Sequence, residues 1–171
     1  ARFDLALDAE SAGLWRLEMS DKYGFAGDPV EREILAEPDA APAVQVLRPA
    51  AETLRLPPRE RLLIAYTLED DHGLGAAEML VAVDGRQLEP VVVPTDEADE
   101  LAPATTVLDL ARLDLHHARK VTFQVRARDN RPEPLGGPQE GFSAVRTIEL
   151  DVKAPSYAFQ VQLDLDLRIR E

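Results

Sequence analysis

The chain contains no cysteine among its 171 residues. This absence excludes disulfide frameworks, zinc sites built from thiolates and cysteine nucleophiles. Aromatic residues make up only 5% of the chain, and a glycosidase or carbohydrate-binding protein would need aromatic platforms for sugars. No apolar stretch approaches the roughly 20 residues of a membrane-spanning helix. If the parent protein is exported or anchored in a membrane, the segment responsible is expected outside this chain.

Positive charge is also scarce, because 19 Lys and Arg residues face 32 Asp and Glu residues, for a formal net charge of −13. Nucleic acids and anionic membranes both require a basic face on the protein, so this charge argues against either as a partner. An acidic surface keeps a protein soluble, and it can also contact divalent cations. Only four serines occur, with no Gly-x-Ser-x-Gly motif and no visible pairing of nucleophile and base. We therefore expect a protein that is not an enzyme.

Strand-like alternation of apolar and polar residues dominates the middle of the chain. Leu62, Ile64 and Tyr66 alternate in one segment, and Asp84-Gly85 is a strong signal for a tight hairpin turn. About seven short strands at spacings of roughly 8–12 residues predict an all-β, antiparallel immunoglobulin-like β-sandwich. The side chains expected in its core are Leu62, Ile64, Tyr66, Val81, Phe123, Val125 and Ile148.

A pattern of two strands closed by a proline occurs twice. The first copy runs from Leu14 to Glu37, and the second runs from Val121 to Lys153. We interpret residues 1–38 as the C-terminal strands of a preceding immunoglobulin-like module, which adds a partial second β module to the fold. Residues 39–153 then form the complete sandwich, and residues 154–171 form an amphipathic tail.

The tail alternates without interruption from Phe159 to Ile169. A helix would scatter these apolar residues over two opposite faces, so we predict a strand, with a helix as the alternative. The N-terminal strands also have one apolar face, which carries Phe3, Leu5, Leu7, Trp15, Leu17 and Met19. Because unpaired amphipathic strands aggregate, we expect the tail to pair with these strands. The pairing would occur within the chain or across a dimer by strand exchange.

Three further stretches resemble tandem immunoglobulin-like repeats of large bacterial envelope proteins. They are Pro42–Pro49 at the start of the module, Thr67–Leu74 after its second strand, and Val125–Asn130 before its last loop. The stretch from Gly13 to Gly24 resembles the end of a preceding repeat. The resemblance covers about residues 1–155 and implies an extracytoplasmic, non-catalytic module in a periplasmic or cell-envelope protein. It implies no ligand.

The only metal prediction concerns Ca²⁺. In a sandwich of this topology the linker, the loop after the second strand and the last loop lie at one end. That end gathers oxygen ligands of the kind Ca²⁺ prefers, on Asp39, Asp70, Asp71, Asp129 and Asn130. The alternative is that each Asp closes its own turn by accepting backbone N–H bonds. No other cofactor is predicted.

Three functions remain open. The first is a structural spacer or protein-interaction module, whose partners are other protein modules or a second copy of the chain. The second is a Ca²⁺-dependent adhesion module. The third is a carbohydrate-binding sandwich, which would need exposed aromatic side chains on one sheet, and we rank it last.

Overall fold

The computed structural model describes residues 13–16, 18–19, 21–24, 27, 30–35, 38–95 and 103–168, with only the backbone described for residues 164–168. The chain divides into two units, residues 1–39 and residues 40–171. No helix in the described part of the chain is long and apolar enough to cross a membrane.

The first unit contains a two-stranded antiparallel sheet of β1 (Gly13–Arg16) and β2 (Glu31–Ile34), with Trp15 opposite Arg32. All four residues of β1 are exposed, and Trp15 retains 40% of its surface accessible to solvent. The expectation that Trp15 faces a core is therefore not met by the described residues of this unit. The described residues of this unit form a two-stranded sheet, and two strands alone bury little apolar surface. Four residues of the predicted apolar face, Phe3, Leu5, Leu7 and Leu17, lie outside the described residues.

The second unit is a sandwich of two sheets, which confirms the predicted all-β immunoglobulin-like fold. The smaller sheet has the strand order β3-β5-β9, and the larger has the order β4-β12-β10-β6-β7, with β11 added beside β10 and β8 beside β6. The strands of the smaller sheet are β3 (Ala43–Arg48), β5 (Arg61–Glu69) and β9 (Ala104–Asp109). Those of the larger sheet are β4 (Thr53–Leu56), β6 (Leu74–Val83), β7 (Arg86–Gln87), β8 (Val91–Val93), β10 (Lys120–Asp129), β11 (Glu140–Phe142) and β12 (Arg146–Leu150).

The first strand of the sandwich is split between the two sheets. β3 pairs antiparallel with β5, whereas β4 pairs in parallel with β12, with Leu54 opposite Ile148. Pro49, which is fully buried, lies between the two pieces. A proline has no backbone N–H to give to a ladder, so the strand is interrupted where it changes sheets.

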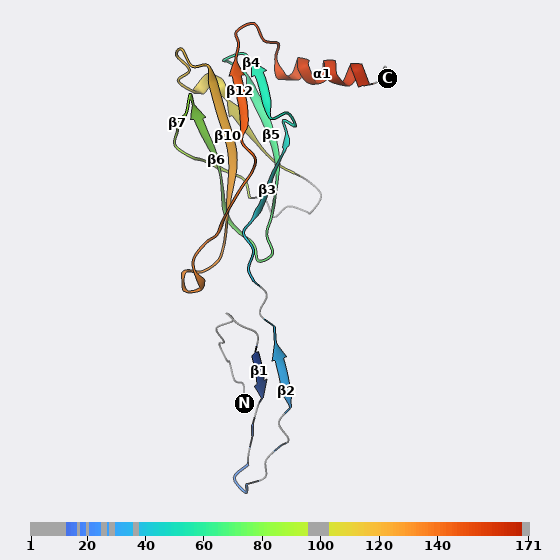
Figure 1. Cartoon of the computed structure of the whole chain (residues 1–171), viewed down its shortest axis with the longest axis vertical. Helices are drawn as coiled ribbons and strands as arrows, with labels where there is room; N and C mark the ends of the chain where they lie inside the picture. The colour runs from blue at the N-terminus through green and yellow to red at the C-terminus, as the bar shows by residue number, and fades with distance from the viewer. Residues whose placement is uncertain are drawn as a thin grey trace. The chain divides into compact units, whose positions relative to one another are not determined.

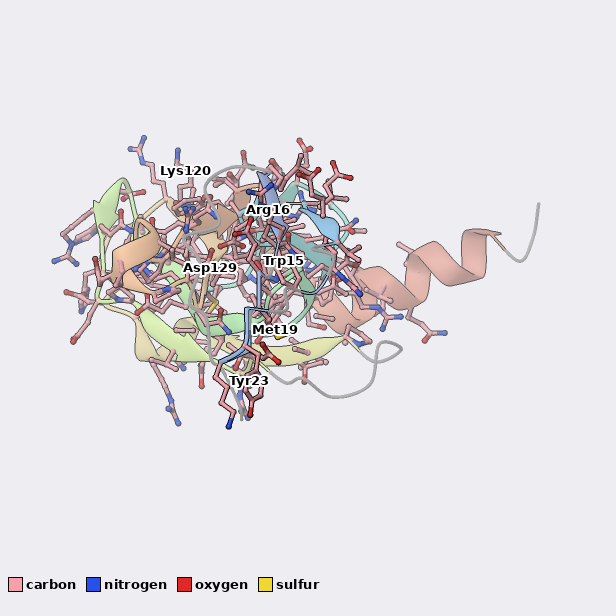
Figure 2. The ribbon with its side chains drawn as sticks, turned by 90° about the horizontal axis from the view of Figure 1, so that it is seen from below. Trp15, Arg16, Met19, Tyr23, Lys120 and Asp129 are labelled. Atoms are coloured by element: carbon pink, nitrogen blue, oxygen red, sulfur yellow. The ribbon has the colours of Figure 1, made fainter. Side chains whose placement is uncertain are left out.

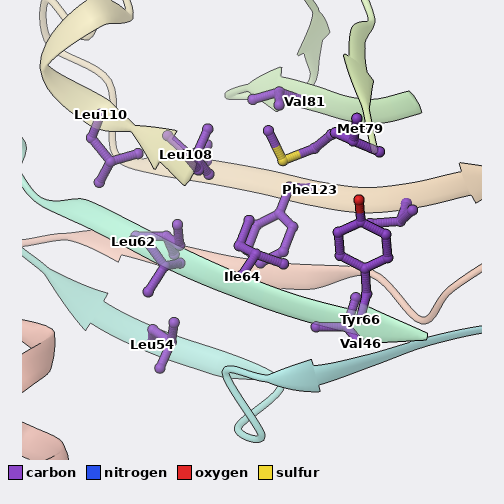
Figure 3. Close-up of a cluster of buried hydrophobic side chains, with 14 of the residues drawn as sticks. Val46, Leu54, Leu62, Ile64, Tyr66, Met79, Val81, Leu108, Leu110 and Phe123 are labelled. Atoms are coloured by element: carbon purple, nitrogen blue, oxygen red, sulfur yellow. The ribbon is translucent and has the colours of Figure 1, made fainter. Parts of the chain in front are cut away.

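The core lies between the sheets and is centred on the inward rows of β5 and β10 (Figure 3). Along β10, burial alternates strictly from Val121 to Asp129. All seven predicted core residues have at most 3% of their surface exposed, which confirms the predicted facing of these strands. Tyr66 is fully buried, and its hydroxyl donates a 2.6 Å hydrogen bond to the carbonyl of Pro94. A buried Tyr needs such a partner for its hydroxyl.

The predicted hairpin turn at Asp84-Gly85 connects β6 to β7. Both residues have positive φ, 47° and 86°, which is the geometry of the type I′ turn that Asp-Gly favours. The Asp84 carboxylate also accepts hydrogen bonds from the backbone N–H groups of Arg119 (3.1 Å) and Lys120 (2.9 Å). This side chain therefore ties the hairpin to the start of β10.

The tail is not the predicted strand but helix α1 (Tyr157–Arg168). The Ser156 hydroxyl accepts a 3.3 Å hydrogen bond from the Phe159 N–H, as an N-cap does. The segment after it contains no Gly or Pro, and its three Leu, two Gln, one Ala and one Arg all favour helix. The predicted strand exchange rested on this segment being a strand, so it loses its basis.

Tyr157 and Gln160, in the first turns of helix α1, attach the helix to the sandwich. Tyr157 packs against the core, where burial raises the pKa of its hydroxyl. The side-chain amide of Gln160 donates a 2.9 Å hydrogen bond to the Arg55 carbonyl on β4. Phe159 and Leu163 are exposed, because a helix directs alternating apolar residues to both of its sides.

Gly141 offers a direct test of this packing. A Cβ atom at Gly141 would overlap the backbone carbonyl of Pro42, where β11 approaches the chain just before β3. We expect Gly141→Ala to lower the free energy of unfolding by about 3 kcal/mol, at the upper end of overpacking effects. The measurement is urea denaturation followed by far-UV circular dichroism. The matched control is Gly13→Ala, because a Cβ at Gly13 meets nothing within 4 Å; equal stabilities for the two variants would contradict the packing.

Candidate functional site: the acidic loops at one end of the sandwich

The structure brings four of the five predicted Ca²⁺ ligands to the same end of the second unit. Asp70 and Asp71 lie in the loop between β5 and β6, and Asp129 and Asn130 lie where β10 ends. The backbone N–H of Asn130 donates to the Gly73 carbonyl (3.1 Å), and its side-chain amide donates to the His72 carbonyl (3.2 Å). Asp39, the fifth candidate, belongs to the first unit, so the geometry below concerns the other four.

Asp70 braces the loop that it begins. One carboxylate oxygen, Oδ2, accepts hydrogen bonds from the N–H groups of His72 (3.2 Å) and Gly73 (2.7 Å). Gly73 has a φ of +108°, a conformation that residues with a side chain rarely adopt. The other oxygen, Oδ1, is buried and has no hydrogen-bond partner among the described residues.

Asp129 plays the same part for the loop between β10 and β11. It is the last inward residue of β10 and only 2% exposed, and Figure 2 labels it. Its Oδ1 accepts from the N–H groups of Arg131 (3.1 Å) and Gln139 (2.9 Å), which closes the base of the loop. Its Oδ2 is buried without a hydrogen-bond partner among the described residues. The carboxylate thus satisfies backbone donors that the loop would otherwise leave unpaired.

Asp71 differs from these two because it is exposed. Its Oδ2 lies 3.9 Å from Nε2 of His72 and accepts a long hydrogen bond (3.4 Å) from the Ala40 N–H. Within residues 40–95 and 103–163, no three carboxylate or imidazole side chains lie close enough together to hold one ion. Ca²⁺ takes six to eight oxygen ligands. The hydrogen bonds therefore show turn bracing by Asp70 and Asp129, and Ca²⁺ binding at these residues stays a prediction.

Near the same end, an ion-pair network crosses the outer face of the larger sheet. The Arg126 guanidinium, with 19% of its side chain exposed, binds the carboxylates of Glu78 on β6 and Glu140 on β11. Arg128 binds Glu140 as well, at 2.8 Å. The sequence shows that Arg126 and Arg128 face outward, but their partners depend on the register between β10 and its neighbours. That register pairs Arg126 with Glu78, and sequence reasoning missed the network for this reason.

The only serine in the core region has no catalytic geometry. Ser143 is 5% exposed, and its Oγ accepts from the Val125 N–H (2.9 Å) and donates to the Ala144 carbonyl (3.1 Å). The first bond joins β10 to the segment that leads into β12, and the second lies within that segment. The hydroxyl therefore holds strands together.

Comparison with known proteins adds little beyond the fold. No protein-family model matches the sequence, and no curated protein matches it. Fibronectin(III)-like modules of Clostridium thermocellum CbhA are similar over 66% of this chain and 99% of theirs, at 14% identity and a TM-score of 0.37. A Ca²⁺-stabilized adhesin that helps an Antarctic bacterium reach out and bind ice is similar over 84% of this chain and 33% of its own, at 12% identity and a TM-score of 0.40. The strand order and register described above establish the fold independently of both.

The ion-pair network predicts how stability depends on pH. The hydrogen bond from Arg126 is the main cause that holds the pKa of Glu78 below its usual value. A carboxyl with a lowered pKa stabilises the fold above its unfolded pKa of about 4.3, and this contribution is lost as pH falls through the folded pKa. We therefore expect the wild type to exceed Glu78→Gln in stability at pH 6, with the difference shrinking below about pH 4.

Urea denaturation at several pH values measures this difference. Glu89→Gln is the matched control, because Glu89 is exposed and forms no ion pair within the described part of the chain. A stability difference between wild type and Glu78→Gln that stays constant from pH 6 to pH 3 would contradict the role assigned to Arg126.

Proposed function

We propose that the second unit is a non-catalytic, extracytoplasmic spacer or protein-interaction module. One observation carries the proposal: the chain enters the sandwich at one end and leaves it at the other (Figure 1). β3 begins with Ala43 opposite Glu69, the last residue of β5, whereas β5 itself begins at the far end. β12 finishes at that far end, with Leu150 opposite Leu56.

This arrangement adds length to a polypeptide. The strands run between the two ends, and the ten residues of β10 span about 33 Å at 3.3 Å per residue. A module whose two chain ends lay side by side would project from the polypeptide without separating the segments before and after it. The spacer therefore separates whatever precedes it from whatever follows it.

Bracing at both ends supports a stiff spacer. Asp70 and Asp129 close the loops at the end where β3 begins. At the other end Asp84 joins the β6–β7 turn to β10, and the Leu150 N–H donates to the Arg119 carbonyl (2.9 Å). Loops held by such bonds keep the path of the chain constant where it enters and leaves.

A carbohydrate-binding function has less support. Phe142 on β11 and Phe159 on α1 are the exposed aromatic side chains among the described residues of the second unit. They lie on different elements, so they do not favour a carbohydrate platform on one sheet. The extracytoplasmic location rests on the sequence resemblance to bacterial envelope repeats.

A distance measurement tests the spacer. Because the chain has no cysteine, Glu133→Cys and Ala111→Cys place spin labels at opposite ends of the sandwich. We expect a narrow distance distribution centred at about 30–40 Å by double electron–electron resonance, set by strands of about ten residues. The control pair Ala111→Cys and Lys153→Cys places both labels at one end and gives a clearly shorter distance. A broad distribution for the first pair would contradict a stiff spacer.

Ca²⁺-dependent adhesion is the second candidate function, and the buried, unpartnered oxygens of Asp70 and Asp129 are the observation that favours it. We expect millimolar Ca²⁺ to leave the melting temperature unchanged, because no three ligand side chains converge among the described residues of the second unit. A ligand that binds only the folded state raises the melting temperature by mass action. A rise in melting temperature that saturates with Ca²⁺ concentration would therefore favour a Ca²⁺-dependent adhesion module over the spacer.

Variants decide where any such ion binds. A rise abolished by Asp70→Asn and Asp129→Asn would assign the ion to these loops. The matched control is Asp114→Asn, because Asp114 also accepts a backbone N–H, from His116, but at the opposite end of the sandwich. Differential scanning calorimetry with Mg²⁺ in place of Ca²⁺ separates specific binding from general screening of charge.

A further inference from the structure

The end of the sandwich at which β12 finishes carries an unusual excess of cations for so acidic a chain. We define the basic surface as residues 55–61, 84–86, 109–120 and 149–153. It contains eight basic and six acidic residues, although the chain as a whole carries a net charge of −13. Lys120 lies at the periphery in Figure 2.

Four backbone hydrogen bonds join these segments into one continuous surface. The Asp84 N–H donates to the Lys120 carbonyl, and the Leu150 N–H donates to the Arg119 carbonyl, each at 2.9 Å. The other two bonds run from Asp151 N–H to Leu56 carbonyl at 2.9 Å and from Leu110 N–H to Glu60 carbonyl at 3.0 Å. The charges of the four segments therefore act together on whatever approaches this end.

Five of the eight cations of the basic surface are available for binding, whereas most of its acids are engaged. Five exposed side chains form no ion pair within the described part of the chain, namely Arg59, Arg86, Arg119, Lys120 and Lys153. By contrast, Asp84 and Asp151 accept backbone N–H groups. Asp109 lies between Arg61 (3.6 Å) and Arg112 (3.5 Å).

The opposite end has the opposite charge. We define the acidic surface as residues 69–73 and 129–140, which contain six acidic residues and one basic residue. Of the six acids, Asp129 is buried and Glu140 is paired with Arg126 and Arg128. The bonds from Asn130 to Gly73 and His72 hold the two segments together. Glu69, Asp71 and Glu133 are exposed there. The sandwich is therefore electrically polar along the direction in which the chain runs through it.

Each surface also presents an exposed apolar side chain. Val152 on the basic surface is 84% exposed, and Leu135 on the acidic surface is 44% exposed. Protein interfaces combine apolar contacts at the centre with a polar rim. Both components are present at each end.

We propose that the basic surface docks onto the acidic surface of a second copy of this chain, head to tail. The proposal rests on the spacer function, because a spacer that enters and leaves at opposite ends brings these two surfaces face to face along a string. Complementary charge selects this orientation, because acidic against acidic or basic against basic is repulsive. The interface is heterologous, so it extends into open strings and does not close into a symmetric dimer.

Docking between separate molecules is weak, since the surfaces are small and exposed charges are screened by salt. A covalent link between successive modules raises the effective concentration to the millimolar range, so a weak contact still stiffens a string. The experiment must therefore detect weak contacts at high protein concentration.

Intermolecular paramagnetic relaxation enhancement, measured as broadening of amide NMR signals, meets this requirement. One copy of the full chain carries a spin label at Ala111→Cys, which leaves every cation of the basic surface in place, and the other copy is labelled with ¹⁵N. At millimolar protein and 0.1 M NaCl we expect broadening of the amides of Gly73, Asn130 and Gly136 on the acidic surface. In 0.5 M NaCl, where screening is stronger, the broadening falls.

Charge reversal tests the pairing of the two surfaces. Arg119→Glu with Lys120→Glu in the labelled copy should reduce the broadening at least about tenfold, because like charges then face each other. Asp71→Lys with Glu133→Lys in the ¹⁵N copy should do the same. Mixing the two reversed copies restores opposite charges and should restore the broadening. The control for the second reversal is Glu52→Lys with Glu89→Lys in the ¹⁵N copy, which makes the same change of net charge as Asp71→Lys with Glu133→Lys at exposed positions outside both surfaces.

The results separate docking from the spacer function. Absence of broadening at millimolar protein, broadening that survives either reversal alone, or broadening confined to α1 would each overturn the docking proposal. The distance between the Glu133→Cys and Ala111→Cys labels, measured in dilute protein, tests the spacer independently. If the distance has the expected value and no broadening occurs, the spacer function stands and the docking proposal fails.

Discussion

The second unit depends on the burial of two inward rows of side chains, one from β5 and one from β10, against each other. Ile64 and Tyr66 are fully buried, and Phe123 is 1% exposed. Because side chains alternate with a period of two, a shift by one residue would turn an entire row outward. The core therefore fixes the register of each strand, and the register fixes which loops meet at each end of the sandwich.

The carboxylates at the loops follow from this arrangement. Asp70, Asp84 and Asp129 each accept two backbone N–H groups at a place where a strand ends or turns. A loop leaves backbone donors without a ladder partner, and an Asp side chain is well suited to satisfy them. An acidic chain can thus use part of its negative charge to close its turns. At the end where β12 finishes, several cations therefore have no acidic partner among the described residues, and this sets the charge polarity of the module.

Particular elements show how far the sequence predicts the structure. The inward rows could be predicted because alternation is local, and the Asp84-Gly85 turn could be predicted because few residues adopt positive φ. The prediction of a strand for the tail was wrong. It followed the alternation from Phe159 onward, whereas the helix begins at the N-cap Ser156, which follows Pro155. The candidate ligands Asp70, Asp71, Asp129 and Asn130 do share one end, as topology predicted. Whether two loops bring their oxygens around one point depends on side-chain geometry that no spacing encodes.

The sequence by itself determined the fold class, the facing of the core residues and the main turns, because each of these depends on periodicity or on the conformational preferences of neighbouring residues. Only the tertiary structure decided that Arg126 meets both Glu78 and Glu140, that Gly141 lies against Pro42, and that the charged loops separate into an acidic and a basic end. These contacts join residues far apart in the chain. Their partners are chosen by strand register and sheet packing, which arise only when the two sheets close over a common core.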